Sequence, residues 1–88
     1  MTFSEILNAS KTFLYLTGKD AYIREHGICT HSAKSNFASL LNNRKDVVVV
    51  VNKNTAPKYA KAINRLGYIL NGKADYSSDE YILYYQSI

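Results

Sequence analysis

Five consecutive valines at positions 47–51 constrain the fold of this chain more than any other feature. Successive side chains of a strand point to opposite faces of a sheet, so a run that is apolar at every position is buried on both faces. Such a strand is typical of the interior of a parallel or mixed sheet that other elements cover on both sides. The sequence therefore predicts a buried strand over residues 46–51, followed by a polar turn, Asn52-Lys53-Asn54.

A helix is predicted directly after this turn, because Thr55 can cap it and Pro57 falls in the first turn, where a missing backbone N–H costs nothing. At about 100° per residue, the apolar side chains fall on one side of the helix and three cations share the opposite side. The apolar set is Ala56, Tyr59, Ala60, Ile63 and Leu66, and the cationic set is Lys58, Lys61 and Arg65. We expect the apolar side to pack on the valines, the cations to face outward and Gly67 to end the helix.

The N-terminal third of the chain predicts a short helix and a strand. Ser4 can cap a helix that carries Phe3, Ile6 and Leu7 on one side. Residues 11–18, KTFLYLTG, are rich in β-branched and aromatic residues and close on a glycine, which predicts a strand followed by a turn. One helix over residues 2–17 is the competing interpretation. Residues 19–31 stay open between helix and strand, although ICTH at 28–31 is able to form a short strand.

Two further segments complete the expected elements. Residues 32–43 predict a helix, because apolar residues recur on one face and two asparagines follow; the apolar residues are Ala33, Phe37, Leu40 and Leu41. Residues 68–70, YIL, predict a strand. The C-terminal segment has two interpretations: a helix capped by Ser77 or Ser78, and a hairpin in which residues 68–70 pair with residues 81–85.

These elements predict a single α/β domain over residues 1–88. We expect a central, mostly parallel sheet with helices on both faces, because the valine strand needs cover on both sides. An α+β winged-helix-like fold is the alternative, since residues 56–70 also resemble a recognition helix followed by a wing.

Three fragments resemble the BRCT domain family. Residues 11–18 resemble its first strand and Thr-Gly turn, residues 46–70 its third strand, second helix and fourth strand, and residues 77–85 its closing helix. The resemblance covers about half of the chain, and it implies a four-stranded parallel sheet flanked by three helices. It also implies a phosphate pocket, with Thr17, Gly18 and Lys58 at the matching positions, and hence a phosphopeptide-binding module as one expected function.

Positive charge is concentrated in the middle of the chain. The net charge is +4, yet residues 30–65 alone carry seven cations and one acid, a balance of +6. Such a patch attracts polyanions through a field that salt screens over roughly 8–10 Å. The turn before the helix adds free backbone N–H groups and the positive end of the helix dipole. The candidate phosphate-binding residues are therefore Lys58, Lys61, Arg65, Lys53, Thr55, Arg44 and Lys45.

The sequence contains no catalytic or cofactor motif, so we expect a protein that is not an enzyme and holds no cofactor. His26 and His31 flank Cys29, the single cysteine, but two imidazoles and one thiol are a poor zinc set without a further acidic ligand. We therefore expect no metal site. One cysteine, no signal-peptide pattern and no long apolar run predict a cytoplasmic protein without membrane contact.

The leading hypothesis is a small, non-enzymatic module that binds the phosphates of RNA or DNA through the cationic side of the helix. Eight tyrosines add side chains that, where exposed, stack on unpaired bases or anchor protein interfaces. The alternative is a protein-directed inhibitor or adaptor, such as a phage protein that blocks a host enzyme or defence factor through the same basic surface. The sequence leaves the partner and the oligomeric state open.

Overall fold

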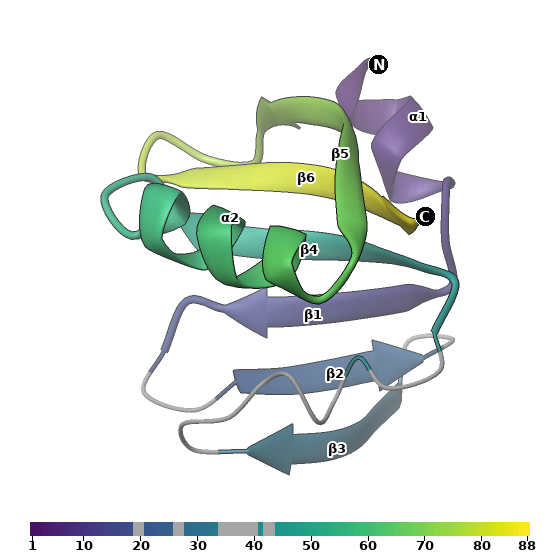
Figure 1. Ribbon diagram of the computed structural model, residues 1–88. Coiled ribbons are helices and arrows are strands. Elements are labelled where there is room, and N and C mark those ends of the chain that lie inside the picture. The colour runs from purple at the N-terminus through teal and green to yellow at the C-terminus, as the bar shows by residue number, and fades with distance from the viewer. Residues whose placement is uncertain (19–20, 26–27, 34–40, 42–43) are drawn as a thin grey trace.

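The valine strand lies inside a six-stranded sheet in the computed structural model (Figure 1), which describes residues 1–18, 21–25, 28–33, 41 and 44–88, with the backbone alone for residues 28–33. The strands are β1 (Thr12–Leu16), β2 (Ala21–Glu25), β3 (Ile28–Ala33), β4 (Asp46–Asn52), β5 (Tyr68–Asp75) and β6 (Glu80–Ser87). The helices of this part of the chain are α1 (Phe3–Leu7) and α2 (Ala56–Arg65). The strands lie across the sheet in the order β3-β2-β1-β4-β6-β5.

Strand direction differs from the prediction. Only the pair β1 and β4 is parallel, and the other neighbours pair antiparallel, so the expected mostly parallel sheet is wrong. The short connections from β1 to β2 and from β5 to β6 explain two of the antiparallel pairs, because short links join antiparallel neighbours whereas parallel neighbours need a long crossover. The valine run is compatible with this mixed sheet because an apolar strand needs cover on both faces, whatever the direction of its neighbours.

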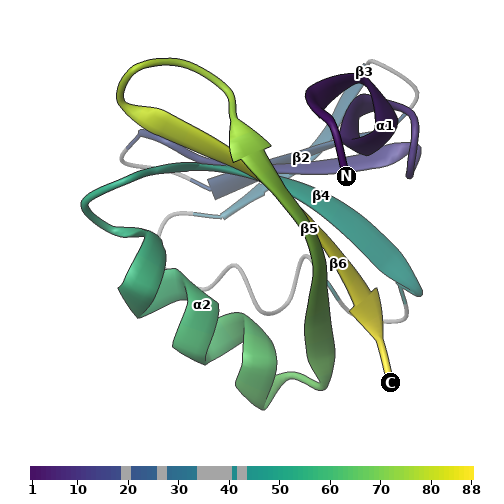
Figure 2. The same ribbon diagram turned by 90° about the horizontal axis from the view of Figure 1, so that it is seen from above.

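Strand β4 is buried on both faces, which confirms the prediction: each of its five valines is at most 1% exposed. Val47, Val49 and Val51 belong to the core under α2. Val48 and Val50 belong to the core on the other face, which includes a buried side chain of α1. Figure 2 shows the two helices on opposite sides of the sheet. We call the side that carries α1 the α1 face and the side that carries α2 the α2 face.

Helices do not flank the sheet in the expected way. Helix α1 has five residues and packs against β5 and β6, so it leaves the β1 and β2 part of its face without helical cover (Figure 1). The predicted parallel sheet with helices over both faces, which the BRCT resemblance also implied, is therefore wrong. The winged-helix-like alternative is wrong too, because α2 follows a central strand and packs on a six-stranded sheet.

Helix α2 confirms the prediction made from its sequence. Ala56 and Ile63 are buried against the sheet, and Gly67 follows the helix with φ of 93°, a left-handed conformation that glycine adopts without strain. Two details differ. The Thr55 hydroxyl donates to the Asn52 carbonyl oxygen and does not cap the helix with its side chain, and Leu66 is 42% exposed.

The two ends of the chain resolve the open alternatives. Helix α1 is capped by Thr2 and not by Ser4: the Thr2 hydroxyl accepts from the Glu5 N–H, and the Glu5 carboxylate accepts from the Thr2 N–H. Strand β1 is confirmed, so a single helix over residues 2–17 is wrong. The C-terminal segment forms a hairpin and not the helix, since β5 pairs with β6 along its length. Its register differs from the prediction, because residues 68–70 pair with residues 85–87 and not with residues 81–85.

The segment before β4 is only partly described. Residues 32 and 33 belong to β3, so the helix predicted over 32–43 cannot begin there. Leu41 is buried in the core on the α2 face, while residues 34–40 and 42–43 lie outside the described part of the chain. In the segment 19–31, whose structure the sequence left open, residues 21–25 form β2 and residues 28–31 belong to β3. Residues 19–20 and 26–27 and the side chains of Cys29 and His31 lie outside the described part of the chain.

Candidate nucleic-acid interface

Three cations line the outer side of α2. Lys58, Lys61 and Arg65 are all exposed, as the sequence predicts, and we call them the basic stripe. Helix α2 contains no acidic residue that could pair with them one turn away. Within the described residues no carboxylate forms an ion pair with the basic stripe. Its charge is therefore directed at solvent from a rigid element.

The N-terminus of α2 lies at the same edge of the sheet as the end of β1 (Figure 1). The Asn52 side-chain amide donates to the Thr17 carbonyl oxygen at 3.3 Å, which joins the two segments. Thr17, exposed Gly18 and Thr55 therefore occupy one rim of the sheet, close to the start of the basic stripe. The Thr55 hydroxyl donates to the Asn52 carbonyl oxygen, so this proton is not available to a phosphate.

Lys53 is less available than the basic stripe. Its ammonium nitrogen lies 3.2 Å from Asp75 Oδ1 and 5.1 Å from the centre of the Tyr81 ring. Lys73, which the sequence argument did not select, lies over the same ring at 4.2 Å. Lys53, Lys73 and Tyr81 line a hollow of about 250 Å³ between the start of α2 and the β5–β6 hairpin. Part of the positive charge here is matched by Asp75.

Arg44 and Lys45 lie at the opposite end of β4 from the rim, about 20 Å away along a strand of this length. Arg44 forms an ion pair with Glu25, and its carbonyl oxygen accepts from the Tyr68 hydroxyl at 2.6 Å. Lys45 is exposed. The structure therefore does not bring this pair together with the rim. The Arg44 side chain instead links the end of β2 to the segment before β4, two strands that lie on either side of β1.

The β1 and β2 part of the α1 face carries a group of side chains that the sequence argument missed. Phe13 and Tyr15 of β1 and Tyr22 of β2 form an aromatic platform, with ring centres 6.3 Å apart for the first pair and 5.0 Å for the second. The Arg24 guanidinium carbon lies 5.5 Å from the Tyr15 ring centre and 5.9 Å from that of Tyr22. All three rings are half-buried, and Arg24 is exposed.

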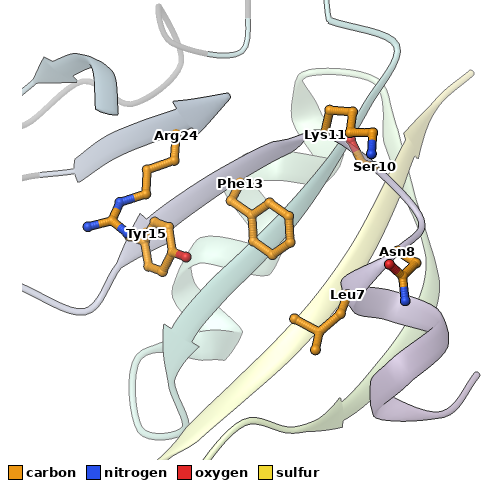
Figure 3. Close-up of a pocket in the computed structure, with 7 residues that line it drawn as sticks. All are labelled: Leu7, Asn8, Ser10, Lys11, Phe13, Tyr15 and Arg24. Carbon is orange, nitrogen blue, oxygen red and sulfur yellow. The ribbon is translucent and has the colours of Figure 1, made fainter. Parts of the chain in front are cut away.

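A pocket of about 580 Å³ opens between this platform and α1. Figure 3 shows Leu7 of α1 and Asn8, which follows the helix, on one side of it, Phe13 and Tyr15 on the other and Arg24 beside Tyr15. The remaining lining residues are Ser10 and Lys11. Two cations and two aromatic rings therefore share one open surface.

Beside this pocket, the Asp46 carboxylate accepts from the Ser10 hydroxyl at 2.8 Å and from the Tyr84 hydroxyl at 3.2 Å. Burial, followed by the nearby Tyr76, raises the pKa of the Tyr15 hydroxyl above its ordinary value of 10.0. Tyr15 is therefore neutral at physiological pH and adds no negative charge to the pocket.

Comparisons of the chain with protein-family models, curated proteins and solved structures found no match. They leave the resemblance to BRCT domains, the binding function and the absence of catalysis as predictions. No helix within the described ranges is long and apolar enough to span a bilayer. Among the same residues no group of three His, Cys, Asp or Glu side chains is placed to hold a metal ion.

Proposed function

We propose that this protein is a small, non-enzymatic, cytoplasmic module that binds nucleic acid and contacts phosphates through the basic stripe of α2. The observation that carries the proposal is the stripe itself: three exposed cations on one side of one helix, with no acidic residue in that helix. Lys and Arg side chains that neutralise phosphates supply most of the affinity of sequence-independent nucleic-acid binding.

The way α2 is held supports this proposal. Ala56 and Ile63 fix its inner side on the central strands, so the cations project from a helix whose position is set by the core. The rim at Thr17 and Gly18 extends the surface beyond the helix N-terminus, where exposed backbone N–H groups and the helix dipole favour an anion. Lys53 contributes less, because Asp75 matches its charge.

Two variants of equal net charge test the proposal. Replacing the three stripe residues by glutamine lowers the net charge from +4 to +1, and so does the control Ser4→Glu, Asn71→Glu, Ser78→Glu at exposed positions outside α2. We expect the glutamine variant to lose at least about tenfold in affinity for a single-stranded oligonucleotide, about 1.4 kcal/mol, and the control to lose much less. Circular dichroism of both variants checks that they remain folded.

Equal losses in the two variants would show that only net charge matters and would contradict a defined binding surface. Purification of the parent protein from cells separates the proposal from its alternative. Retained nucleic acid supports binding, whereas a retained polypeptide together with no affinity for oligonucleotides would favour a protein-directed inhibitor.

A further inference from the structure

The α1 face has an aromatic surface that the basic stripe does not explain. Phe13, Tyr15 and Tyr22 stand side by side on two neighbouring strands, in the part of the face that α1 does not cover. Phe13 and Tyr15 alternate with the buried Leu14 and Leu16, so the two rings lie on the α1 face and the two leucines on the α2 face. Phe13 and Tyr15 pack by one side against the core of the α1 face, and their half-exposed sides are open to a ligand.

We propose that this aromatic platform, with Lys11 and Arg24, stacks the unpaired bases of a single-stranded nucleic acid. The inference rests on the proposed function and names its substrate class. Every base has a flat π-face that stacks on an aromatic ring, and the two cations are placed for the adjoining phosphates. Arg24 adds a guanidinium plane beside the rings, which itself stacks on bases.

Single strands fit this surface better than duplexes. In a duplex each base face is already covered by its neighbours in the stack, so rings standing on a sheet have no base face to contact. The rim links the platform to the basic stripe, since Tyr15 lies two residues before Thr17 and pairs with Val50 near the end of β4. A flexible strand that leaves the platform over this edge reaches the N-terminus of α2.

A second copy of the chain is a poorer occupant than nucleic acid. Two copies that met symmetrically through this face would bring Arg24 and Lys11 of both copies into one interface. Like charges brought together in an interface oppose association. A polyanion instead gains from the same arrangement.

The test compares a single strand of about 12 nucleotides with its duplex, using three proteins. The double variant Tyr15→Leu, Tyr22→Leu keeps apolar bulk and removes two rings, and the matched control Tyr15→Phe, Tyr22→Phe keeps the rings. We expect the parent and the phenylalanine control to bind the single strand more tightly than the duplex. The leucine variant should lose at least about 5-fold in single-strand affinity, the lower end of the effect of one stack, with its duplex affinity unchanged.

Photocrosslinking of the parent protein to a strand that contains 5-iodouracil provides a second measurement that does not depend on a folded variant. Crosslinks to peptides of β1 and β2 support the inference, and crosslinks confined to α2 overturn it. It also fails if the duplex binds as well as the single strand, or if the leucine variant changes only the oligomeric state. The proposed function is contradicted by a different result, in which the parent protein binds neither the single strand nor the duplex.

Discussion

A carboxylate placed inside the valine strand tests the central packing of the fold. Val49 is fully buried, lies between Leu14 of β1 and Leu83 of β6, and belongs to the core under α2. Val49→Asp loses the burial of a valine, worth about 1.5–3 kcal/mol. It also buries a carboxyl group that has no hydrogen-bond partner, which costs about 1–3 kcal/mol even when the group is neutral.

At neutral pH the largest part of the lost stability comes from keeping the buried Asp carboxyl protonated. An aspartate with an unfolded-state pKa of about 3.9 must hold its proton in the core, and at pH 7 this costs about 4 kcal/mol at 1.36 kcal/mol per pH unit. The total of about 7–10 kcal/mol compares with an expected stability of about 4–13 kcal/mol for 88 residues. We therefore expect Val49→Asp to be largely unfolded at pH 7.

The pH dependence has a definite sign. Because the folded-state pKa is raised above the unfolded value, stability is highest below about pH 4 for this group and falls as the pH rises. Urea unfolding followed by circular dichroism measures the difference in stability between pH 4 and pH 7. Asn54→Asp, at an exposed position, is the control for an added acid. Val49→Ala, expected to be about 2 kcal/mol less stable than the parent, is the control for lost volume. A Val49→Asp protein that is stable at pH 7, with no gain on acidification, would refute the buried position of this side chain.

Three further changes have defined effects on stability. Gly67→Ala should lower the free energy of unfolding by about 1–2 kcal/mol, because φ of 93° is strained for a residue with a Cβ atom, and chemical denaturation measures it. Thr2→Ala removes the capping box of α1 and should cost about 1 kcal/mol in the same assay, while Thr2→Ser should retain most of the stability. Burial raises the pKa of Tyr85, so stability should hold below pH 10.0 and fall as the pH rises further; a fall as steep in Tyr85→Phe as in the parent would contradict this assignment.

The elements with strong local signals were predictable from the sequence. The valine run could only be a strand with cover on both faces, and α2 was set by Pro57, the spacing of its apolar residues and Gly67. Strand order and direction were not predictable in the same way, because they depend on which segments meet across the sheet. Residues 19–31 carried no periodic pattern, so the strands β2 and β3 that make the sheet mostly antiparallel were left open.

The C-terminal segment shows how two local signals compete. Ser77, Ser78, Asp79 and Glu80 match a helix N-terminus, yet in the structure the Ser77 hydroxyl donates to the Glu80 carboxylate and accepts from the Asp79 N–H within a hairpin turn. The aromatic and β-branched residues that follow pair with β4 and β5, and this burial outweighs the capping signal.

The candidate site was predictable in part. The exposure of the basic stripe followed from helical spacing, but its role in binding stays a prediction. The ion pairs of Lys53 and Arg44 depend on the strand order, because each pair joins segments that lie on either side of a third strand. The alternation of side chains in a strand puts Phe13 and Tyr15 on one face of β1. The pairing of Tyr22 on β2 with Tyr15, which completes the aromatic platform, could not be predicted from the sequence.

The salt dependence of single-strand affinity tests the central claim most directly. Three to five phosphate contacts predict that log affinity falls with log salt at a slope of about −2 to −3.5, at about −0.7 per contact. Replacing Lys58, Lys61 and Arg65 by glutamine should make that slope shallower by about 2, while the control of equal net charge keeps the slope of the parent. A parent affinity that does not change with salt, or an unchanged slope in the glutamine variant, would contradict phosphate binding by the basic stripe.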